Sequence, residues 1–193
     1  MKTLKLIGAI VGGLAVLFFV VALVLPDKVH VERSVIINKP ADQVFPYLAD
    51  FNQFVKWNPW SSLDPNQKTE ISNPSSGVGA KYSWAGNDEV GVGSLVVAKE
   101  EVNKSIEQTL TFTAPWQSVS TAKYTLEPAE GGTKVVWSYD GEASPFPIGR
   151  YMGTMMDGML GPQYDKGLQA LKALAEAAPE QPKGETPKEE VKK

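Results

Sequence analysis

The sequence has no cysteine and a single histidine, His30. The absence of cysteine excludes disulfide bonds, thiolate catalysis and zinc sites with cysteine ligands. With one imidazole in the chain, a serine-histidine-aspartate arrangement or a histidine-based metal site loses its main participant. His30 lies a few residues after an apolar N-terminal run, at the start of an expected strand. We therefore interpret it as a solvated side chain rather than a general base.

The chain also has no excess of positive charge, because 19 Lys and Arg against 22 Asp and Glu give a net charge of -3. The basic residues are scattered without forming a stripe, which excludes nucleic acid as an expected partner. Adjacent carboxylates at Asp88–Glu89 and Glu100–Glu101 lie at the ends of expected strands, where solvated charge is usual. Gly91 and Gly93 lack the strand-then-helix setting of a phosphate-binding loop. The residues thus predict no catalytic residue, no metal site and no cofactor.

An apolar run extends from Leu4 to Leu25, with Lys5 near its start as its one charge. This length matches the ~20 residues that cross ~30 Å of hydrocarbon. Lys2, Lys5 and the amino terminus predict a cytoplasmic N-terminus, with the rest of the chain on the non-cytoplasmic side. A cleaved signal peptide also has a charged start, but its apolar region is about 7 to 15 residues and ends in small residues. We expect residues 1–28 to be a cytoplasmic stub and an uncleaved transmembrane anchor.

Residues 29–178 are expected to form one domain that begins with a strand at Val29–Ile37. A helix should follow Pro40, with Val44 and Leu48 on its buried face, and Phe51–Trp60 reads as a second short helix. From Lys68 the apolar period changes to two, and the short joins rich in Gly, Pro and Asn permit only antiparallel neighbours. The expected strands are Lys68–Ser72, Ala80–Trp84, Glu89–Glu100, Lys104–Thr113, Val119–Glu127 and Thr133–Gly141.

The segment Pro147–Ala177 has a sustained helical period. Its first half carries four methionines at positions i, i+3, i+4 and i+7, which predicts one stripe facing the sheet. The apolar residues of its second half come out about 120° further round, so we expect a kink or bulge at Gly161–Pro162. The first stripe is Met152, Met155, Met156 and Met159, and the second is Tyr164, Leu168, Leu171 and Leu174.

The order of elements is strand, two helices, six strands and a long helix, which predicts an α+β domain with the helices on one face of an antiparallel sheet. Residues 179–193 contain one large apolar residue among Pro, Glu and Lys. Such a composition buries too little surface to offset the entropy of ordering. We expect these residues to be a disordered tail.

Several segments, taken in order, resemble the SRPBCC family, the START and Bet v 1-like superfamily that includes polyketide cyclase/dehydrase-like proteins. They are Val31–Phe45, Trp57–Trp60, Val78–Trp84, Gly91–Gly93, Gly132–Trp137 and Gly161–Leu168. The resemblance implies a helix-grip fold, in which a seven-stranded antiparallel sheet curves around the C-terminal helix and encloses an apolar cavity. It implies no activity and carries over no catalytic residue, because the superfamily includes lipid carriers, hormone receptors, cyclases and chaperone activators.

Aromatic residues recur on single faces of the expected strands, and these faces can point at the methionine stripe. Together they would enclose an apolar space in which Tyr, Trp and Gln supply a few polar contacts, or they would fill a solid core. Methionine is flexible and polarizable, which suits varied hydrophobic guests. The expected lining residues are Tyr82, Trp84, Gln108, Leu110, Phe112, Tyr124, Trp137, Tyr139, Met152, Met155, Met156 and Met159.

Three functions are consistent with these patterns. The first is a membrane-anchored, non-enzymatic protein that binds a hydrophobic small molecule or lipid and is held by Leu4–Leu25. The second is a cyclase or dehydratase, which requires an inward titratable group with a shifted pKa. The third is an envelope interaction or stress-related domain with a filled core. The sequence names no ligand, and it predicts no oligomeric state.

Overall fold

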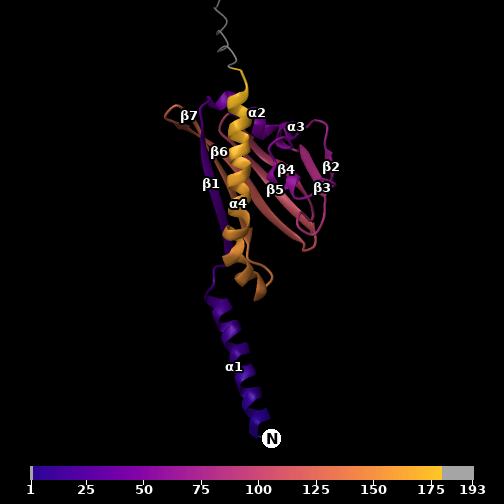
Figure 1. Cartoon of the computed structure of the whole chain (residues 1–193), viewed down its shortest axis with the longest axis vertical. Coiled ribbons are helices and arrows are strands. Elements are labelled where there is room, and N and C mark those ends of the chain that lie inside the picture. The colour runs from indigo at the N-terminus through magenta and orange to yellow at the C-terminus, as the bar shows by residue number, and fades with distance from the viewer. Residues whose placement is uncertain (1, 180–193) are drawn as a thin grey trace, which may run out of the picture.

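The computed structural model describes residues 2–179, which form a long isolated helix followed by a curved sheet and its covering helices (Figure 1). The residues after Pro179, which include most of the expected tail, lie outside the described range. The elements are α1 (Lys2–Val24), β1 (Lys28–Ile37), α2 (Ala41–Ala49), α3 (Phe51–Phe54), a 3-10 turn (Pro59–Ser62), β2 (Lys68–Ile71), β3 (Lys81–Ala85), β4 (Val92–Glu101), β5 (Ser105–Ala114), β6 (Ser118–Ala129), β7 (Gly132–Glu142) and α4 (Ile148–Ala177).

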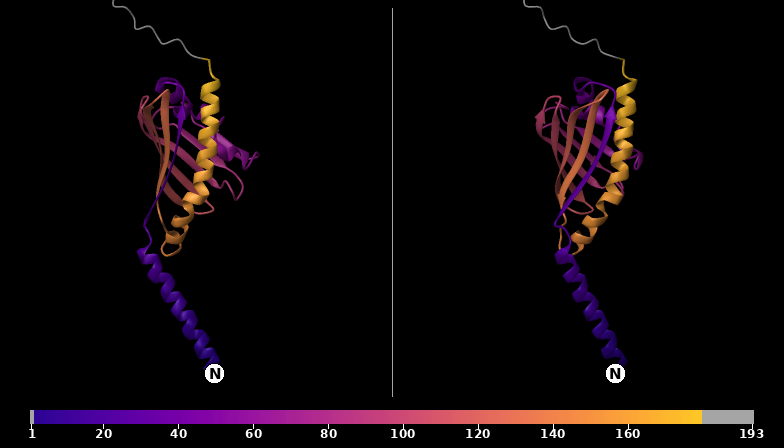
Figure 2. Two further views of the ribbon diagram at one scale, coloured as in Figure 1. Left: turned by 60° about the vertical axis from the view of Figure 1, so that its left-hand side comes forward. Right: turned by 90° about the vertical axis from the view of Figure 1, so that its left-hand side faces the viewer.

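The seven strands form one antiparallel sheet in the order β1-β7-β6-β5-β4-β3-β2. β2 to β7 follow one another as neighbours because their connections are short, whereas β1 pairs with β7 along its whole length, from Lys28 opposite Glu142 to Ile37 opposite Thr133. Figure 2 shows the sheet curving around α4. The expected α+β class, the seven-stranded antiparallel sheet and the long C-terminal helix are confirmed.

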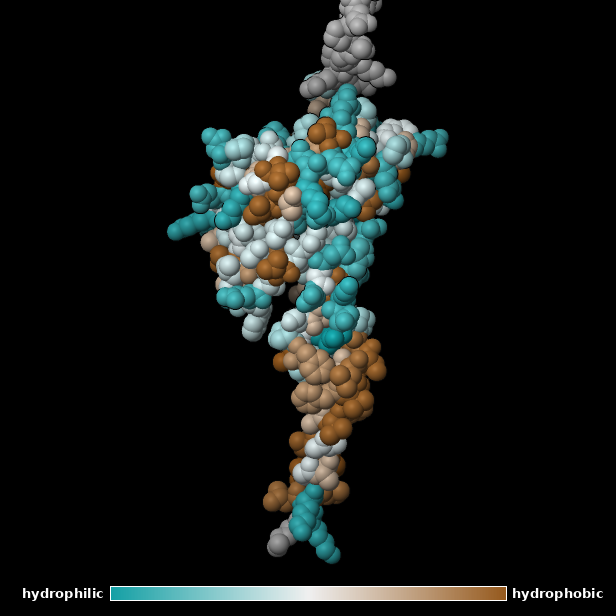
Figure 3. Space-filling view, turned by 180° about the vertical axis from the view of Figure 1, so that it is seen from behind, coloured by the Kyte–Doolittle hydropathy of each residue, from teal (hydrophilic) through white to brown (hydrophobic). Residues whose placement is uncertain are grey.

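Helix α1 projects away from the sheet, and nearly all of its apolar side chains are exposed. Figure 3 shows it as a brown column beside the mixed surface of the domain. By length and composition α1 is able to cross a membrane. The structure thereby confirms an N-terminal apolar helix.

Helix α4 is continuous through Pro162, and Figure 2 shows its orange first half inclined to its yellow second half. One stripe faces the sheet along the whole helix, so no rotation between two stripes is needed. Its members are Gly149, Gly153, Met156, Leu160, Tyr164, Leu168, Leu171 and Ala175. The predicted stripe of four inward methionines is wrong, since Met152, Met155 and Met159 are 48%, 60% and 59% exposed.

Close packing explains this correction. A Cβ at Gly153 would lie 3.0 Å from the Val29 side chain, and one at Gly149 would lie 2.5 Å from the Ser144 backbone. The first turns of α4 approach β1 and the β7–α4 connection so closely that glycine occupies the inward positions. Met152, Met155 and Met159 consequently take the adjoining face, and Met156 alone of the four packs against the core.

The second expected helix is also shorter than predicted. α3 ends at Phe54, and a separate 3-10 turn begins at Pro59. Asp50 caps α3 by accepting a hydrogen bond from the Asn52 amide at 2.8 Å, and the Asn58 side chain caps the 3-10 turn through the Trp60 amide at 3.1 Å. Proline removes a backbone donor and disfavours helix in the residue before it, so two short turns replace one helix.

Candidate ligand-binding cavity

A cavity of about 460 Å³ lies between the concave face of the sheet, the α3–β2 segment and α4. This volume is within the ~300 to 1,000 Å³ of small-molecule sites. Most of its wall is aromatic or aliphatic. The lining includes Phe54, Asn58, Trp60, Leu63, Tyr82, Trp84, Leu95, Gln108, Leu110, Phe112, Ala122, Tyr124, Trp137, Tyr139, Met156, Met159, Leu160, Gln163 and Tyr164.

The structure brings most of the expected lining residues together around this space. Those that line it are Tyr82, Trp84, Gln108, Leu110, Phe112, Tyr124, Trp137, Tyr139, Met156 and Met159. Met152 and Met155 do not line it, because the glycines of the first turns of α4 occupy the inward face. The aromatic faces of the strands therefore pack into the buried core and also line this cavity.

Strand register explains this convergence. Gln108, Leu110 and Phe112 alternate with outward residues along β5, so all three point into the concave face. Gln108 lies opposite Ala122 of β6, and Tyr124 lies opposite Trp137 of β7.

Gly93 allows the Trp84 indole to lie close against the sheet. Gly93 pairs with Trp84 across β3 and β4, and a Cβ there would approach the indole Cζ2 to 2.7 Å and the Thr111 carbonyl to 2.5 Å. The Trp84 ring can then meet Phe112 edge to face, with 5.5 Å between ring centroids.

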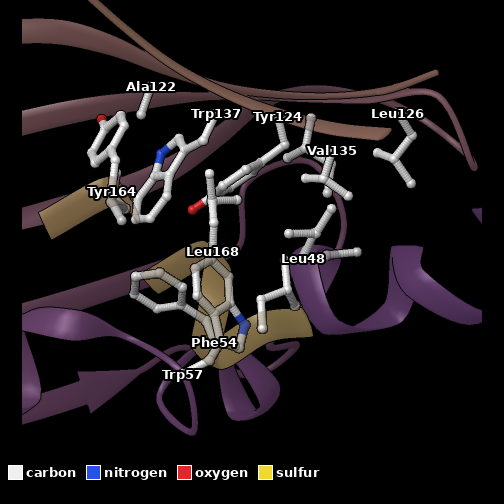
Figure 4. Packing of buried hydrophobic residues seen from close by; sticks show 14 of the residues in the cluster. Leu48, Phe54, Trp57, Ala122, Tyr124, Leu126, Val135, Trp137, Tyr164 and Leu168 are labelled. Carbon is white, nitrogen blue, oxygen red and sulfur yellow. The ribbon is translucent and has the colours of Figure 1, made fainter. Parts of the chain in front are cut away.

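Sequence reasoning missed the contribution of the α3–β2 segment and of the middle of α4. Trp60 meets Trp137 edge to face, with 5.7 Å between ring centroids. Trp137 in turn stacks on Tyr164 at 3.9 Å between ring centroids, and Figure 4 shows these two rings side by side. The Trp57–Trp60 segment was visible in the sequence, but the face of the sheet that it covers was not. Tyr164 was seen only as a helix core residue.

Four polar atoms at the buried end of the cavity lack a hydrogen-bond partner within the described protein. They are Gln108 Oε1, the Tyr124 hydroxyl, Trp137 Nε1 and Gln163 Oε1. Gln108, Tyr124 and Trp137 are 2%, 0% and 3% exposed. Buried polar groups of native proteins nearly always have partners, so these four atoms can bond to water or to a molecule held in the cavity. We refer to Gln108, Tyr124, Trp137 and Gln163 as the inner end of the cavity.

The phenols of Tyr82, Tyr124 and Tyr164 remain protonated at neutral pH. Burial raises the pKa of the Tyr124 hydroxyl well above its ordinary value. Burial likewise raises the pKa of Tyr164 and that of Tyr82, although a hydrogen bond from Asn58 partly lowers the latter. These groups therefore act as neutral donors or acceptors.

Charged groups in the lining lie away from the inner end. Asp88 and Glu89, in the β3–β4 connection, are the acidic residues of the lining, and both are exposed. Among residues 2–179, no three His, Asp or Glu side chains are grouped as metal ligands. His30 lies outside the lining and its Nδ1 is 2.7 Å from Asp140 Oδ1, at the surface. The inner end is thus polar but uncharged.

The cavity reaches the surface at a rim formed by the β3–β4 connection, the β5–β6 turn and α4. The exposed lining residues there are Asp88, Glu89, Pro115, Trp116, Ser118 and Met159. We refer to this set as the cavity mouth. The exposed part of the lining thus lies between α4 and the turns at one end of the sheet.

A curved antiparallel sheet gripping a long helix around an apolar cavity defines a helix-grip protein. Residues 28–176 match the family described as polyketide cyclase/dehydrase and lipid transport, and the chain belongs to this family. No curated protein matches the chain.

Solved structures share the fold at low identity. Protein CV1439 from Chromobacterium violaceum is 16% identical, with a TM-score of 0.56 over 79% of this chain and 100% of that one. The aromatase/cyclase ZhuI from Streptomyces sp. R1128 is 17% identical, with a TM-score of 0.53 over 77% of this chain and 94% of that one. The di-domain ARO/CYC StfQ of the steffimycin biosynthetic pathway is 12% identical, with a TM-score of 0.57 over 78% of this chain and 51% of that one. These likenesses establish the fold.

Proposed function

We propose that this protein binds an uncharged hydrophobic small molecule or lipid in its cavity and is held at a membrane by α1. The observation that carries the proposal is the inner end, where buried polar atoms without protein partners lie at the bottom of an apolar space. A guest with a hydroxyl, carbonyl or amide group can satisfy them, while the apolar wall receives the remainder of the molecule.

The electrostatics of the cavity favour a neutral guest. Moving an ion into an apolar interior is costly unless it is paired, and the acidic side chains of the lining lie at the mouth. Affinity would then come mainly from burial, at roughly 0.8 kcal/mol for each methylene group of the guest. A hydrogen bond to the inner end adds about 1 kcal/mol and fixes which end of the guest enters first.

The membrane role is proposed from α1. Within the described chain most of its apolar side chains remain exposed, with contacts to Tyr151 and Phe146 confined to its C-terminal end, and its length suits a bilayer. Lys2 and Lys5 at its start favour a cytoplasmic N-terminus, so we place the domain of residues 29–178 on the non-cytoplasmic side.

Mass spectrometry of the full-length protein, purified in detergent, tests the binding role. Ala122 lies on the cavity wall and is 4% exposed, so Ala122→Phe places a ring in the cavity. Thr121→Phe adds the same ring to the opposite face of β6 and is the matched control. We expect a co-purified apolar molecule with the wild type and with Thr121→Phe, and its loss with Ala122→Phe. Equal retention by Ala122→Phe and the wild type would contradict a guest in this cavity.

A second candidate is a cyclase or dehydratase reaction in the same cavity. The Tyr124 hydroxyl supports it, because it lies in the cavity without a protein partner and can stabilise a developing oxyanion by donating a hydrogen bond. Binding and catalysis differ in the expected effect of Tyr124→Phe. Loss of one hydrogen bond weakens binding by about fivefold, whereas loss of a donor to a developing oxyanion slows turnover by about 10² to 10³. Chromatography with mass spectrometry of the co-purified molecule, followed over time for a dehydrated or cyclised product, separates the two.

A further inference from the structure

The end of α1 is fixed to the beginning of α4. The Arg150 guanidinium donates to the Leu25 carbonyl oxygen at 2.8 Å, and the Ala143 amide donates to the Asp27 carbonyl oxygen at 2.9 Å. A cation at the C-terminus of a helix also complements the helix dipole. α1 and the first turns of α4 therefore meet at one junction (Figure 1).

The start of α4 extends back along α1 beyond this junction. The Tyr151 ring stacks on Phe18 with 4.6 Å between centroids, and its hydroxyl donates to the Phe18 carbonyl oxygen at 2.6 Å. Phe146 lies beside Phe19, with 6.3 Å between ring centroids. At 1.5 Å per residue, Phe18 is about 9 Å below the end of α1 at Val24.

The length of α1 sets the depth of these contacts. Its 23 residues measure about 35 Å, against ~30 Å of hydrocarbon, so little of the helix can stand outside a bilayer that it crosses. Phe146 and Tyr151 would then lie at the level of the nearest leaflet. Tyrosine is enriched at this boundary between lipid and water.

The first turns of α4 also present a second apolar face. Ile148, Met152, Met155 and Met159 follow an i, i+4, i+7, i+11 pattern and are 61%, 48%, 60% and 59% exposed. We refer to these four residues as the outer stripe. The charged residues between Ile148 and Leu160 are Arg150 and Asp157, and each is bonded elsewhere, to Leu25 and to Arg33. An exposed apolar stripe on a helix that begins beside a membrane span fits a helix lying in the lipid interface.

The cavity mouth lies at the same end of the domain. Lys28 at the start of β1 pairs with Glu142 at the end of β7, and Thr121 near the start of β6 pairs with Asp140. The β5–β6 turn therefore lies at the end of the sheet nearest α1. Its Trp116 is 79% exposed and belongs to the mouth, and Met159 belongs to both the mouth and the outer stripe.

We infer that the outer stripe and Trp116 insert into the leaflet nearest the domain, and that the cavity mouth opens onto lipid between Met159 and Trp116, while the Asp88 and Glu89 carboxylates of the mouth stay in water. The guest then passes laterally from the bilayer into the cavity between Met159 and Trp116. This inference rests on the proposed function, because it needs α1 in a membrane and a guest in the cavity. The acyl chains of the bilayer then cover the outer stripe.

Spin labels test this arrangement in full-length protein reconstituted in phosphatidylcholine and phosphatidylglycerol vesicles. The chain has no cysteine, so each introduced thiol is labelled alone. Met155→Cys and Trp116→Cys report on the outer stripe and the mouth. Ala173→Cys, which is exposed far along α4, and Val102→Cys, in the turn at the opposite end of β5, are the matched controls. All four positions are exposed, so the labels leave the core intact.

We expect the labels at Met155 and Trp116 to be severalfold more accessible to oxygen than to a water-soluble nickel complex, with the opposite order at Ala173 and Val102. Nickel access at all four sites, in protein that floats with vesicles and retains its guest, would overturn the inference while the proposed function stands. Shielding of Met155 from both reagents with spin–spin broadening would show a second copy of the chain on the outer stripe, which also overturns it. Protein that does not float would refute both.

Discussion

Replacing Gln108 by leucine should change protein stability and guest binding in opposite directions. Gln108 is 2% exposed at the inner end of the cavity, and its Oε1 has no hydrogen-bond partner within the described protein. Leucine is similar in size and has no polar atom to desolvate. Gln108→Leu therefore removes a cost from the unloaded protein and a hydrogen-bonding group from the loaded one.

The magnitude follows from the cost of a buried, unsatisfied polar group, which is about 1 to 3 kcal/mol. We expect the free energy of unfolding of unloaded protein to rise by that amount. For a chain of this size, each kcal/mol shifts the melting temperature by about 2 to 4 °C, so the expected increase is about 2 to 12 °C. Affinity for a guest hydrogen-bonded to Gln108 should fall by about 1 kcal/mol, or about fivefold.

Thermal unfolding followed by near-ultraviolet circular dichroism measures the stability term on full-length protein stripped of guest with a hydrophobic resin. Gln169→Leu makes the same exchange at an exposed position of α4 and should stay within about 0.5 kcal/mol of the wild type. The retained fraction of guest, from mass spectrometry, measures the binding term.

The outcome that refutes this reasoning is a lower melting temperature for unloaded Gln108→Leu than for unloaded wild type. It would mean that the amide stabilises the empty fold, and that the inner end is a structural network rather than a binding end. Unchanged guest retention in a more stable variant would show that the guest makes no hydrogen bond with Gln108.

Three further substitutions test the packing of α4 and its ion pair with β1. A Cβ at Gly158 would meet nothing within 4 Å, so Gly158→Ala should raise the free energy of unfolding by about 0.5 to 1 kcal/mol through helix propensity. A Cβ at Gly167 would lie 2.9 Å from the Trp137 ring, so Gly167→Ala should lower it by about 1 to 3 kcal/mol, and urea unfolding of the pair compares them directly. Arg33 donates to both Asp157 oxygens at 2.8 and 3.0 Å, and this hydrogen bonding holds the pKa of Asp157 below its ordinary 3.8. The stability that the pair supplies is therefore present above pH 3.8 and is lost as the pH falls through the lowered pKa, so Arg33→Gln should be less stable than wild type at pH 7 and equal to it in strong acid. A deficit that persists unchanged in strong acid would show that Arg33 acts by packing.

The sheet could be predicted from the sequence because its signals are local. Alternation along Lys104–Thr113 and Val119–Glu127 sets which side chains share a face, and a short join makes the strands antiparallel. The same alternation placed Gln108, Leu110 and Tyr124 on the concave side. The pairing of β1 with β7 is not local and was not predicted, because the family resemblance implied a seven-stranded sheet without a strand order.

The facing of α4 could not be predicted by counting apolar residues. The inward positions of its first turns are held by Gly149 and Gly153, which carry no hydrophobic signal, and their selection depends on how closely Val29 and Ser144 approach. Met152 and Met155, which were predicted to form part of the cavity wall, lie on the adjoining face of the helix and do not line the cavity. Close backbone approach is a tertiary property, and it overrides the apolar period.

The prediction of a single short helix over Phe51–Trp60 failed for a related reason. The Trp57–Trp60 segment ends a helix because of its proline, but its caps come from Asp50 and Asn58 side chains. These caps could be placed only once the chain path was known. Trp60 then reaches Trp137 on the far side of the cavity, a contact that no spacing rule encodes.

Only Leu25, Pro26 and Asp27 separate α1 from β1. Fully stretched, three residues reach about 10 Å. The hydrogen bonds at the α1–α4 junction further restrict the movement of the domain relative to α1. With α1 in a bilayer, a domain held by so short a connection cannot rotate freely or reach a facing membrane. With the domain so placed, a guest of the proposed cavity would enter and leave it at one fixed height above the bilayer.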